Sequence, residues 1–84
     1  MMHNDLGVQL QDAPSGKVVV TGVAAGGAAD GQLEAGDIIV EVNRSPVSRA
    51  ADVSKLVTAA PAGRPILFKV LRNDTTRFVA VERR

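Results

Sequence analysis

The 84-residue sequence contains no cysteine, tryptophan or tyrosine, and its only aromatic residues are Phe68 and Phe78. The lack of cysteine excludes a disulfide framework and a thiolate metal site, but it is compatible with the cytosol and with the periplasm. Proteins that bind single-stranded nucleic acid usually stack the bases on aromatic side chains above a basic groove. With a formal net charge of +1 and no basic run before Arg83-Arg84, this sequence does not indicate nucleic-acid binding.

Long apolar runs are absent as well. No window approaches the roughly 18 apolar residues of a membrane-spanning helix, and the start of the chain holds no apolar segment of the length that a signal peptide needs. Hydrophobic residues make up 45% and charged residues 23% of the sequence, which is typical of a small globular domain. We therefore expect one domain over residues 5–83, a disordered start over residues 1–4, and no membrane span in this chain.

Apolar residues that alternate with polar ones predict several strands. Lys17–Val23 is a run of β-branched residues, which favours a strand. In Ile38–Val42 alternate side chains are expected on one face, which includes Val40 and Val42. The other expected strands are Leu6–Gln11, a brief extended piece at Pro46-Val47, and a hairpin of Ile66–Arg72 and Arg77–Glu82 across Asn73-Asp74-Thr75.

Two helices are expected between these strands. Ser48 is a typical N-cap for a helix over Arg49–Ala60, with Asp52 in the place of the capping-box Glu. The small residues of Ala28–Leu33 predict a short helical turn that Gly36 ends in a left-handed conformation. A mainly antiparallel sheet of about five strands, with one short and one longer helix, indicates an α+β fold built as a small, partly open β-barrel.

The stretch AGDIIVEVNRSPV, residues 35–47, carries the most specific motif of the chain: Gly-Asp, alternating apolar residues, Asn, a turn and Pro-Val. Together with the order of the segments around it, this motif resembles the circularly permuted PDZ domain of bacterial HtrA/Deg-type (DegP/DegQ-like) serine proteases. The resemblance covers Asp5 to Arg83, and the ending TTRFVAVERR is similar to the second, C-terminal PDZ domain of such proteases. The sequence departs from the family pattern at Arg44, where Gly is frequent, at Gly27-Ala28 in place of Ser-Pro, and at Gln32 in place of Gly.

The resemblance implies a site for the C-terminus of a polypeptide. In DLGVQL, residues 5–10, the backbone amides of Leu6, Gly7 and Val8 would bind the terminal carboxylate. The missing side chain of Gly7 would let the ligand approach the backbone. The peptide would add a strand antiparallel to residues 8–11, with the helix over residues 49–60 as the second wall. The expected peptide-binding residues are Leu6, Gly7, Val8, Gln9, Leu10, Ala50, Ser54 and Val57.

Two of these residues also have simpler interpretations. Gly7 fits a plain turn into a strand, and Ser54 fits a solvent-exposed position on a helix. In the family interpretation, an apolar pocket for the last ligand side chain favours peptides that end in Val, Leu, Ile or a Phe-like residue. The expected pocket residues are Leu6, Val8, Leu10 and Val57.

No catalytic site is expected in this chain. A serine protease needs Ser, His and Asp held together beside an oxyanion hole, and the only histidine, His3, lies in the start that is expected to be disordered. Four acidic residues between positions 30 and 41 lack a neighbouring His or Cys. They indicate a solvated face, with Asp37 and Glu41 pointing outward from the strand, rather than a metal site. No metal and no cofactor are expected.

The expected function is that of a non-catalytic PDZ module that binds C-terminal or extended polypeptide segments. It would serve substrate recognition or regulation in an HtrA/Deg-like periplasmic serine protease, and the parent protein would be a trypsin-like serine endopeptidase. The expected partners are polypeptide C-termini, unfolded protein segments and other subunits of the parent protease. The alternative is an assembly module that makes subunit contacts in the protease oligomer with little peptide binding.

Overall fold

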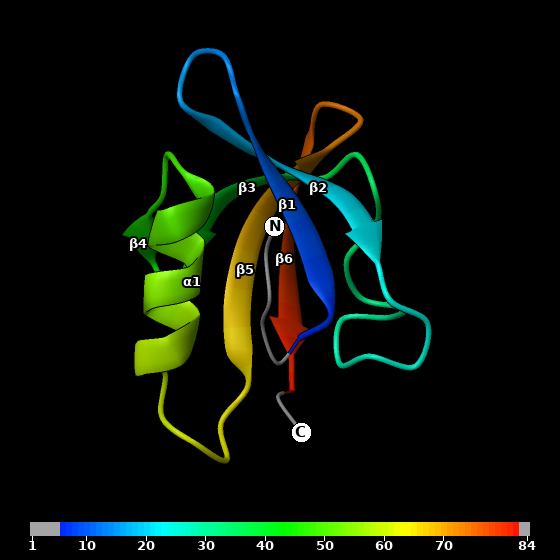
Figure 1. The fold of residues 1–84 in the computed structure, drawn as a ribbon, viewed down its shortest axis with the longest axis vertical. Helices are drawn as coiled ribbons and strands as arrows, with labels where there is room; N and C mark the ends of the chain where they lie inside the picture. The colour runs from blue at the N-terminus through cyan, green and yellow to red at the C-terminus, as the bar shows by residue number, and fades with distance from the viewer. Residues whose placement is uncertain (1–5, 83–84) are drawn as a thin grey trace.

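The computed structural model describes residues 6–82, which form six β-strands and one α-helix (Figure 1). In chain order these are β1 (Val8–Ala13), β2 (Lys17–Val23), β3 (Ile38–Val42), β4 (Ser45–Pro46), α1 (Ala50–Ala59), β5 (Ile66–Arg72) and β6 (Thr75–Val81). All strand pairs are antiparallel in the order β1-β2-β3-β5-β6, and β4 pairs with β3. In Figure 1, β1 and β2 cross in front of β5 and β6, and α1 stands beside β5.

The sheet is curved but not closed, because β1 and β6 stand at opposite ends of the strand order. This confirms the predicted α+β fold with a partly open barrel. The part of the chain that the structure describes holds no helix long and apolar enough to cross a membrane. The predicted disordered start, residues 1–4, lies outside the described residues.

Three strands have the predicted bounds, namely β2, β3 and β5. β6 begins two residues earlier than predicted, because Asn73 and Asp74 alone form the turn, with φ of +51° and +64°. Two successive residues with positive φ give the hairpin turn whose twist matches that of the two strands. β1 begins two residues later than predicted, because Gly7, with φ of +72°, turns the chain before the strand.

Residues 28–33, predicted as a short helix, instead form a series of turns. The Leu33 N–H donates a hydrogen bond to the Ala29 carbonyl at 3.0 Å, as it would in a helix. Gly31, however, has a φ of +83°, a left-handed conformation that interrupts a right-handed helix. The buried side chains of Ala29 and Leu33 hold these turns on the protein. Gly36 has the predicted positive φ, at +98°.

α1 begins one residue later than predicted, and its N-cap is Arg49 rather than Ser48. The predicted role of Asp52 is confirmed, since its Oδ2 accepts the backbone N–H groups of Ser48 at 3.0 Å and Arg49 at 3.2 Å. These hydrogen bonds, that of Ser48 first, lower the pKa of Asp52. At the other end Ala60 is extended, with φ of −66° and ψ of 140°, as favoured for the residue before a proline, here Pro61.

β3 departs from the predicted alternation. Ile39 and Val42 are its buried residues, whereas the pattern placed Val40 on the same face as Val42. The pairing with β5 skips Val40 between Ile39 and Glu41. Such a β-bulge inserts one extra residue and reverses the side-chain alternation beyond it, so Ile39 and Val42 face the core together.

The hydrophobic core lies between the curved sheet, α1 and the turns of residues 24–36. Ile66, Phe68 and Val70 form the inward face of β5. The burial of each large aliphatic or aromatic side chain contributes about 1.5–3 kcal/mol. The core residues are Leu6, Val8, Val18, Val20, Ala29, Leu33, Ile39, Val42, Val53, Val57, Ala60, Ile66, Phe68, Val70, Val79 and Val81.

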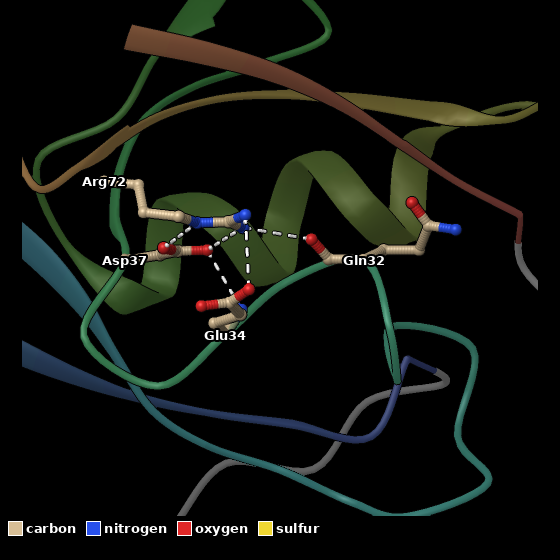
Figure 2. A network of polar contacts seen from close by, with 4 residues as sticks. All are labelled: Gln32, Glu34, Asp37 and Arg72. Carbon is tan, nitrogen blue, oxygen red and sulfur yellow. Dashed lines mark hydrogen bonds and ion pairs between the residues drawn. The ribbon is translucent and has the colours of Figure 1, made fainter. Parts of the chain in front are cut away.

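Asp37 is buried, with 1% of its surface exposed, which corrects the prediction that it points outward into a solvated face. Its Oδ1 and Oδ2 accept hydrogen bonds from Nε and Nη2 of Arg72, at 2.8 Å each (Figure 2). The backbone N–H of Glu34 also donates to Asp37 Oδ2, at 2.9 Å. Arg72 Nη2 donates to the Gln32 carbonyl at 3.1 Å, and its Nη1 lies 3.4 Å from Glu34 Oε2.

The surroundings of Asp37 and Arg72 shift the pKa values of both groups. Burial acts to raise the pKa of Asp37, but it is outweighed by the hydrogen bonds from Arg72 and from the Glu34 N–H and by the positive charges of Arg72 and Arg77. The pKa of Asp37 therefore lies below its ordinary value. The hydrogen bonds to Asp37 in turn raise the pKa of Arg72. Both groups are charged at neutral pH, and together they join the turn before β3 to the end of β5.

Candidate functional site

The loop before β1 is anchored by its carbonyl groups. The Leu6 carbonyl accepts the N–H of Ala29 at 3.1 Å, and the Gly7 carbonyl accepts the N–H of Ala24 at 2.8 Å. Within residues 6–82 the Gly7 N–H donates no hydrogen bond. A turn with a positive φ, anchored on its carbonyl side, is a backbone arrangement that presents N–H groups to an anion. This arrangement at Gly7 is compatible with the predicted carboxylate site, which stays a prediction.

Gly7 also has a packing role that the sequence did not indicate. A Cβ atom at this position would lie 3.2 Å from Ala24 Cβ and 3.6 Å from Gly27 Cα, so a side chain here would be crowded by the turns after β2. At Gly27, a Cβ would lie 3.1 Å from the Leu6 carbonyl oxygen. The two glycines therefore let the loop before β1 pack closely on the turns that follow β2.

The strand of the predicted site is β1. It stands at one end of the strand order, and among the described strands its neighbour is β2. Val8 is buried, Gln9 is exposed and Leu10 is half-buried against the core. Val8 and Leu10 therefore lie on the inner face and Gln9 on the outer face. A strand at the end of a sheet is the position from which a peptide extends the sheet by main-chain hydrogen bonds.

The predicted residues of α1 lie at different depths. Val57 is 4% exposed and belongs to the core, whereas Ala50 and Ser54 are half-buried. Of the predicted apolar pocket, Leu6 and Val8 are core residues like Val57, and Leu10 packs against them. The structure thus gathers the predicted pocket residues in or on one cluster. Ala50 and Ser54 at the surface of α1 remain more accessible than Val57.

Sequence reasoning missed Asp12, the residue that joins the two walls of the predicted site. Asp12 Oδ1 accepts the backbone N–H of Ala50, the first residue of α1, at 2.6 Å across 38 residues of sequence. In Figure 1 the upper end of β1 lies near the start of α1, and the chain runs upward in β1 but downward in α1. An aspartate in a strand gives no local signal of such a contact.

The described residues contain no group of three or more His, Cys, Asp or Glu side chains arranged to hold a metal ion. His3 lies outside the described residues. The groups described above are backbone N–H groups, a strand at one end of the sheet order and an apolar surface.

Comparisons with known proteins agree with this geometry. The family profile "PDZ domain" matches residues 4–82. A "Probable periplasmic serine endoprotease DegP-like" of Brucella suis biovar 1 is 42% identical over 79 residues, which cover 89% of this chain and 15% of that protein. A protein of the same description from Pseudomonas putida strain F1 is 34% identical over 62 residues, which cover 74% of this chain and 13% of that protein.

Solved structures show the same fold. The HtrA-type protease AlgW with a decapeptide superposes with a TM-score of 0.81 at 25% identity, over 92% of this chain and 27% of that chain. The HtrA3 PDZ domain bound to the phage-derived ligand FGRWV superposes with a TM-score of 0.82 at 22% identity, over 94% of this chain and 83% of that chain. The sequence spans about 15% of the length of the Brucella relative.

Proposed function

This chain belongs to the PDZ-domain family, and we propose that it binds C-terminal or extended segments of polypeptides by adding them as a strand along β1. The observation that carries the proposal is the loop at the start of that strand. Its carbonyls are held by Ala24 and Ala29, while the Gly7 N–H donates no hydrogen bond within residues 6–82. A terminal carboxylate that accepts such N–H groups forms charge-assisted hydrogen bonds, which are stronger than neutral ones.

The ligand would run antiparallel to β1, with its carboxylate at Leu6, Gly7 and Val8 and its next residues beside Gln9 and Leu10. Strand addition satisfies the ligand backbone, and its alternate side chains turn toward α1. Leu10 is half-buried and offers more accessible apolar surface than the core residues Leu6 and Val8. The last ligand side chain should be apolar, with Val57 as part of its pocket. Ser54 and Ala50 would line the wall of α1 beside the earlier ligand residues, because Ala50 is hydrogen-bonded to Asp12 near the other end of β1.

The relatives support a particular setting for this activity. We infer that the domain is a recognition or regulatory module of a DegP-like periplasmic serine protease, and the resemblance of its ending favours the second, C-terminal PDZ domain. The DegP-like relatives are described as periplasmic serine endoproteases, and AlgW and the HtrA3 PDZ domain were solved with peptides. The domain itself would be non-catalytic, and the peptidase site would lie elsewhere in the parent protein.

The decisive experiment compares two peptide pools by NMR. The ¹⁵N-labelled domain is titrated with free-acid heptapeptides varied in their last three positions, and with the same pool amidated at the C-terminus. We expect shifts at residues 6–10 and along α1 with the free acids, and amidation should weaken binding by about tenfold or more. Equal titrations would reject the carboxylate site.

No cleavage of unfolded casein is expected from the domain alone, and inhibitor-sensitive cleavage would contradict a non-catalytic role.

One observation favours the alternative function, an assembly module that makes subunit contacts in a protease oligomer. Phe78 on β6 is 65% exposed, with Lys69 Nζ 5.9 Å from the centre of its ring. β6 is the other end of the strand order, opposite the predicted peptide strand. A Phe78→Ser variant should leave peptide binding unchanged, and it should weaken self-association if this surface serves assembly.

A further inference from the structure

We propose that the hydrogen bond between Asp12 and Ala50 closes the peptide site at its far end, so that Asp12 determines how many ligand residues contribute to binding. This inference rests on the proposed function and concerns the same strand. It adds a residue that sets ligand length, at a position where the sequence shows no binding motif.

The first argument is the place of Asp12 in its strand. The partners of Gln9 and Leu10 on β2 are Gly22 and Val20, so the extra residue of this irregular pairing is Thr21 on β2. β1 itself therefore keeps its alternation of side chains. Val8, Leu10 and Asp12 therefore form one row of side chains on the face of β1 toward α1. The first two pack in or on the core, and the third reaches the N-terminus of the helix.

The second argument is the hydrogen bonding at the start of α1. The N–H groups of Ser48 and Arg49 donate to Asp52, a residue of the helix itself. The N–H of Ala50 donates to Asp12 instead, at 2.6 Å. The carboxylate is well placed there, because the first helical N–H groups lack partners within the helix and the helix dipole favours a negative charge. This bond ties β1 to α1 where the two elements meet.

Because of the direction of the ligand, the Asp12–Ala50 bond limits how many ligand residues the site can accept. A peptide antiparallel to β1, with its carboxylate at the loop before Val8, advances one residue for each residue of the strand. Its fourth residue from the end lies opposite Gln11, and its fifth reaches Asp12. Further residues can enter between β1 and α1 only after the Asp12–Ala50 bond opens, so their contacts are offset by the loss of that bond.

A length series with matched variants tests this boundary. The strongest binder of the free-acid pool is shortened and extended to three, four, five and seven residues, and each dissociation constant is measured by calorimetry. In the wild type we expect affinity to rise to four residues and then to change less than about twofold. In Asp12→Ala the seven-residue peptide should bind about fivefold or more tightly than the four-residue peptide.

Asp12→Asn is the control, because it removes the charge but keeps an oxygen that accepts the Ala50 N–H. It should retain the wild-type plateau, while hydrogen exchange of the Ala50 amide should accelerate only in Asp12→Ala. Affinity that rises steadily to seven residues in the wild type, or a plateau that persists in Asp12→Ala, would overturn the inference and leave the proposed function intact. Absence of binding at every length would reject both.

Discussion

Arg72, the last residue of β5, forms a bidentate ion pair with the buried Asp37, in which both hydrogen bonds measure 2.8 Å. The side chain of Arg72 is 18% exposed and that of Asp37 is 1% exposed. The pair joins the turns after β2 to the β5–β6 hairpin, and its further contacts with Gln32 and Glu34 hold the same turns (Figure 2). These turns also support the loop that carries Gly7.

The first prediction removes the charge of Asp37 while keeping its shape. Asp37→Asn leaves Arg72 without its buried counter-charge, so the free energy of unfolding should fall by about 2–4 kcal/mol. Glu34→Gln is the control, because the Glu34 side chain is 65% exposed and its contact with Arg72 should be worth less than about 1 kcal/mol. Urea unfolding of the two variants measures both effects, and equal losses would contradict the dominant role of the buried pair.

The second prediction concerns pH. The pKa of Asp37 in the folded protein lies below its ordinary value of 3.8, so in this acidic range the unfolded chain binds the proton more readily than the folded one. The stabilisation by Asp37 is therefore complete above the ordinary value and is lost as the pH falls through the folded pKa. The difference in unfolding free energy between wild type and Asp37→Asn should shrink as the pH is lowered from 6 to 2 in urea titrations. A difference that stays constant over this range would contradict it.

The sequence predicted those parts of the fold that depend on local patterns. A run of β-branched residues predicted the bounds of β2, and period-two alternation predicted those of β3 and β5. Long-range pairing was not predictable in this way, because Asp37 and Arg72 are 35 residues apart and an aspartate near a strand normally indicates solvent. The bulge at Val40 was hidden for the same reason, since it exists only relative to β5.

The candidate site was predictable to a similar extent. Its strand and helix follow from local patterns and from the family resemblance, which also supplied the loop around Gly7. The contact of Asp12 with Ala50 and the packing of Gly7 on Gly27 depend on how distant segments meet, so no local pattern indicated either contact.

The third prediction separates two features of the turn between β3 and β4. Asn43 and Arg44 have φ of +49° and +70°, and Asn43 Oδ1 accepts the N–H of Leu67 at 2.9 Å. Arg44→Gly should raise the free energy of unfolding by about 0.5–1 kcal/mol, because glycine adopts this conformation without strain. Asn43→Gly also relieves strain but removes the acceptor for Leu67, so it should lower stability by about 1 kcal/mol. Thermal melts that move in the same direction for both variants would contradict this account.

The last prediction concerns the tight packing at Gly7. Gly7 and Gly63 have similar φ, +72° and +80°, but a Cβ at Gly63 would meet nothing within 4 Å, whereas one at Gly7 would lie 3.2 Å from Ala24 Cβ. Gly63→Ala should therefore cost about 1 kcal/mol from backbone strain alone, and Gly7→Ala about 2–3 kcal/mol from strain and crowding. Chemical unfolding of both variants checks the ranking, and equal costs would show that crowding is negligible.

A double-mutant cycle with Ala24→Gly isolates the crowding. Removal of the Ala24 Cβ should restore about 1 kcal/mol to the Gly7→Ala protein beyond what the single changes predict, because the two side chains no longer collide. Additive changes would contradict the contact. The same crowding affects how the peptide site can be tested. A side chain at Gly7 would first disturb the packing of the loop, so a loss of binding in a Gly7 variant would indicate a displaced loop. Amidation of the peptide leaves the protein unchanged, and it therefore tests the carboxylate contact alone.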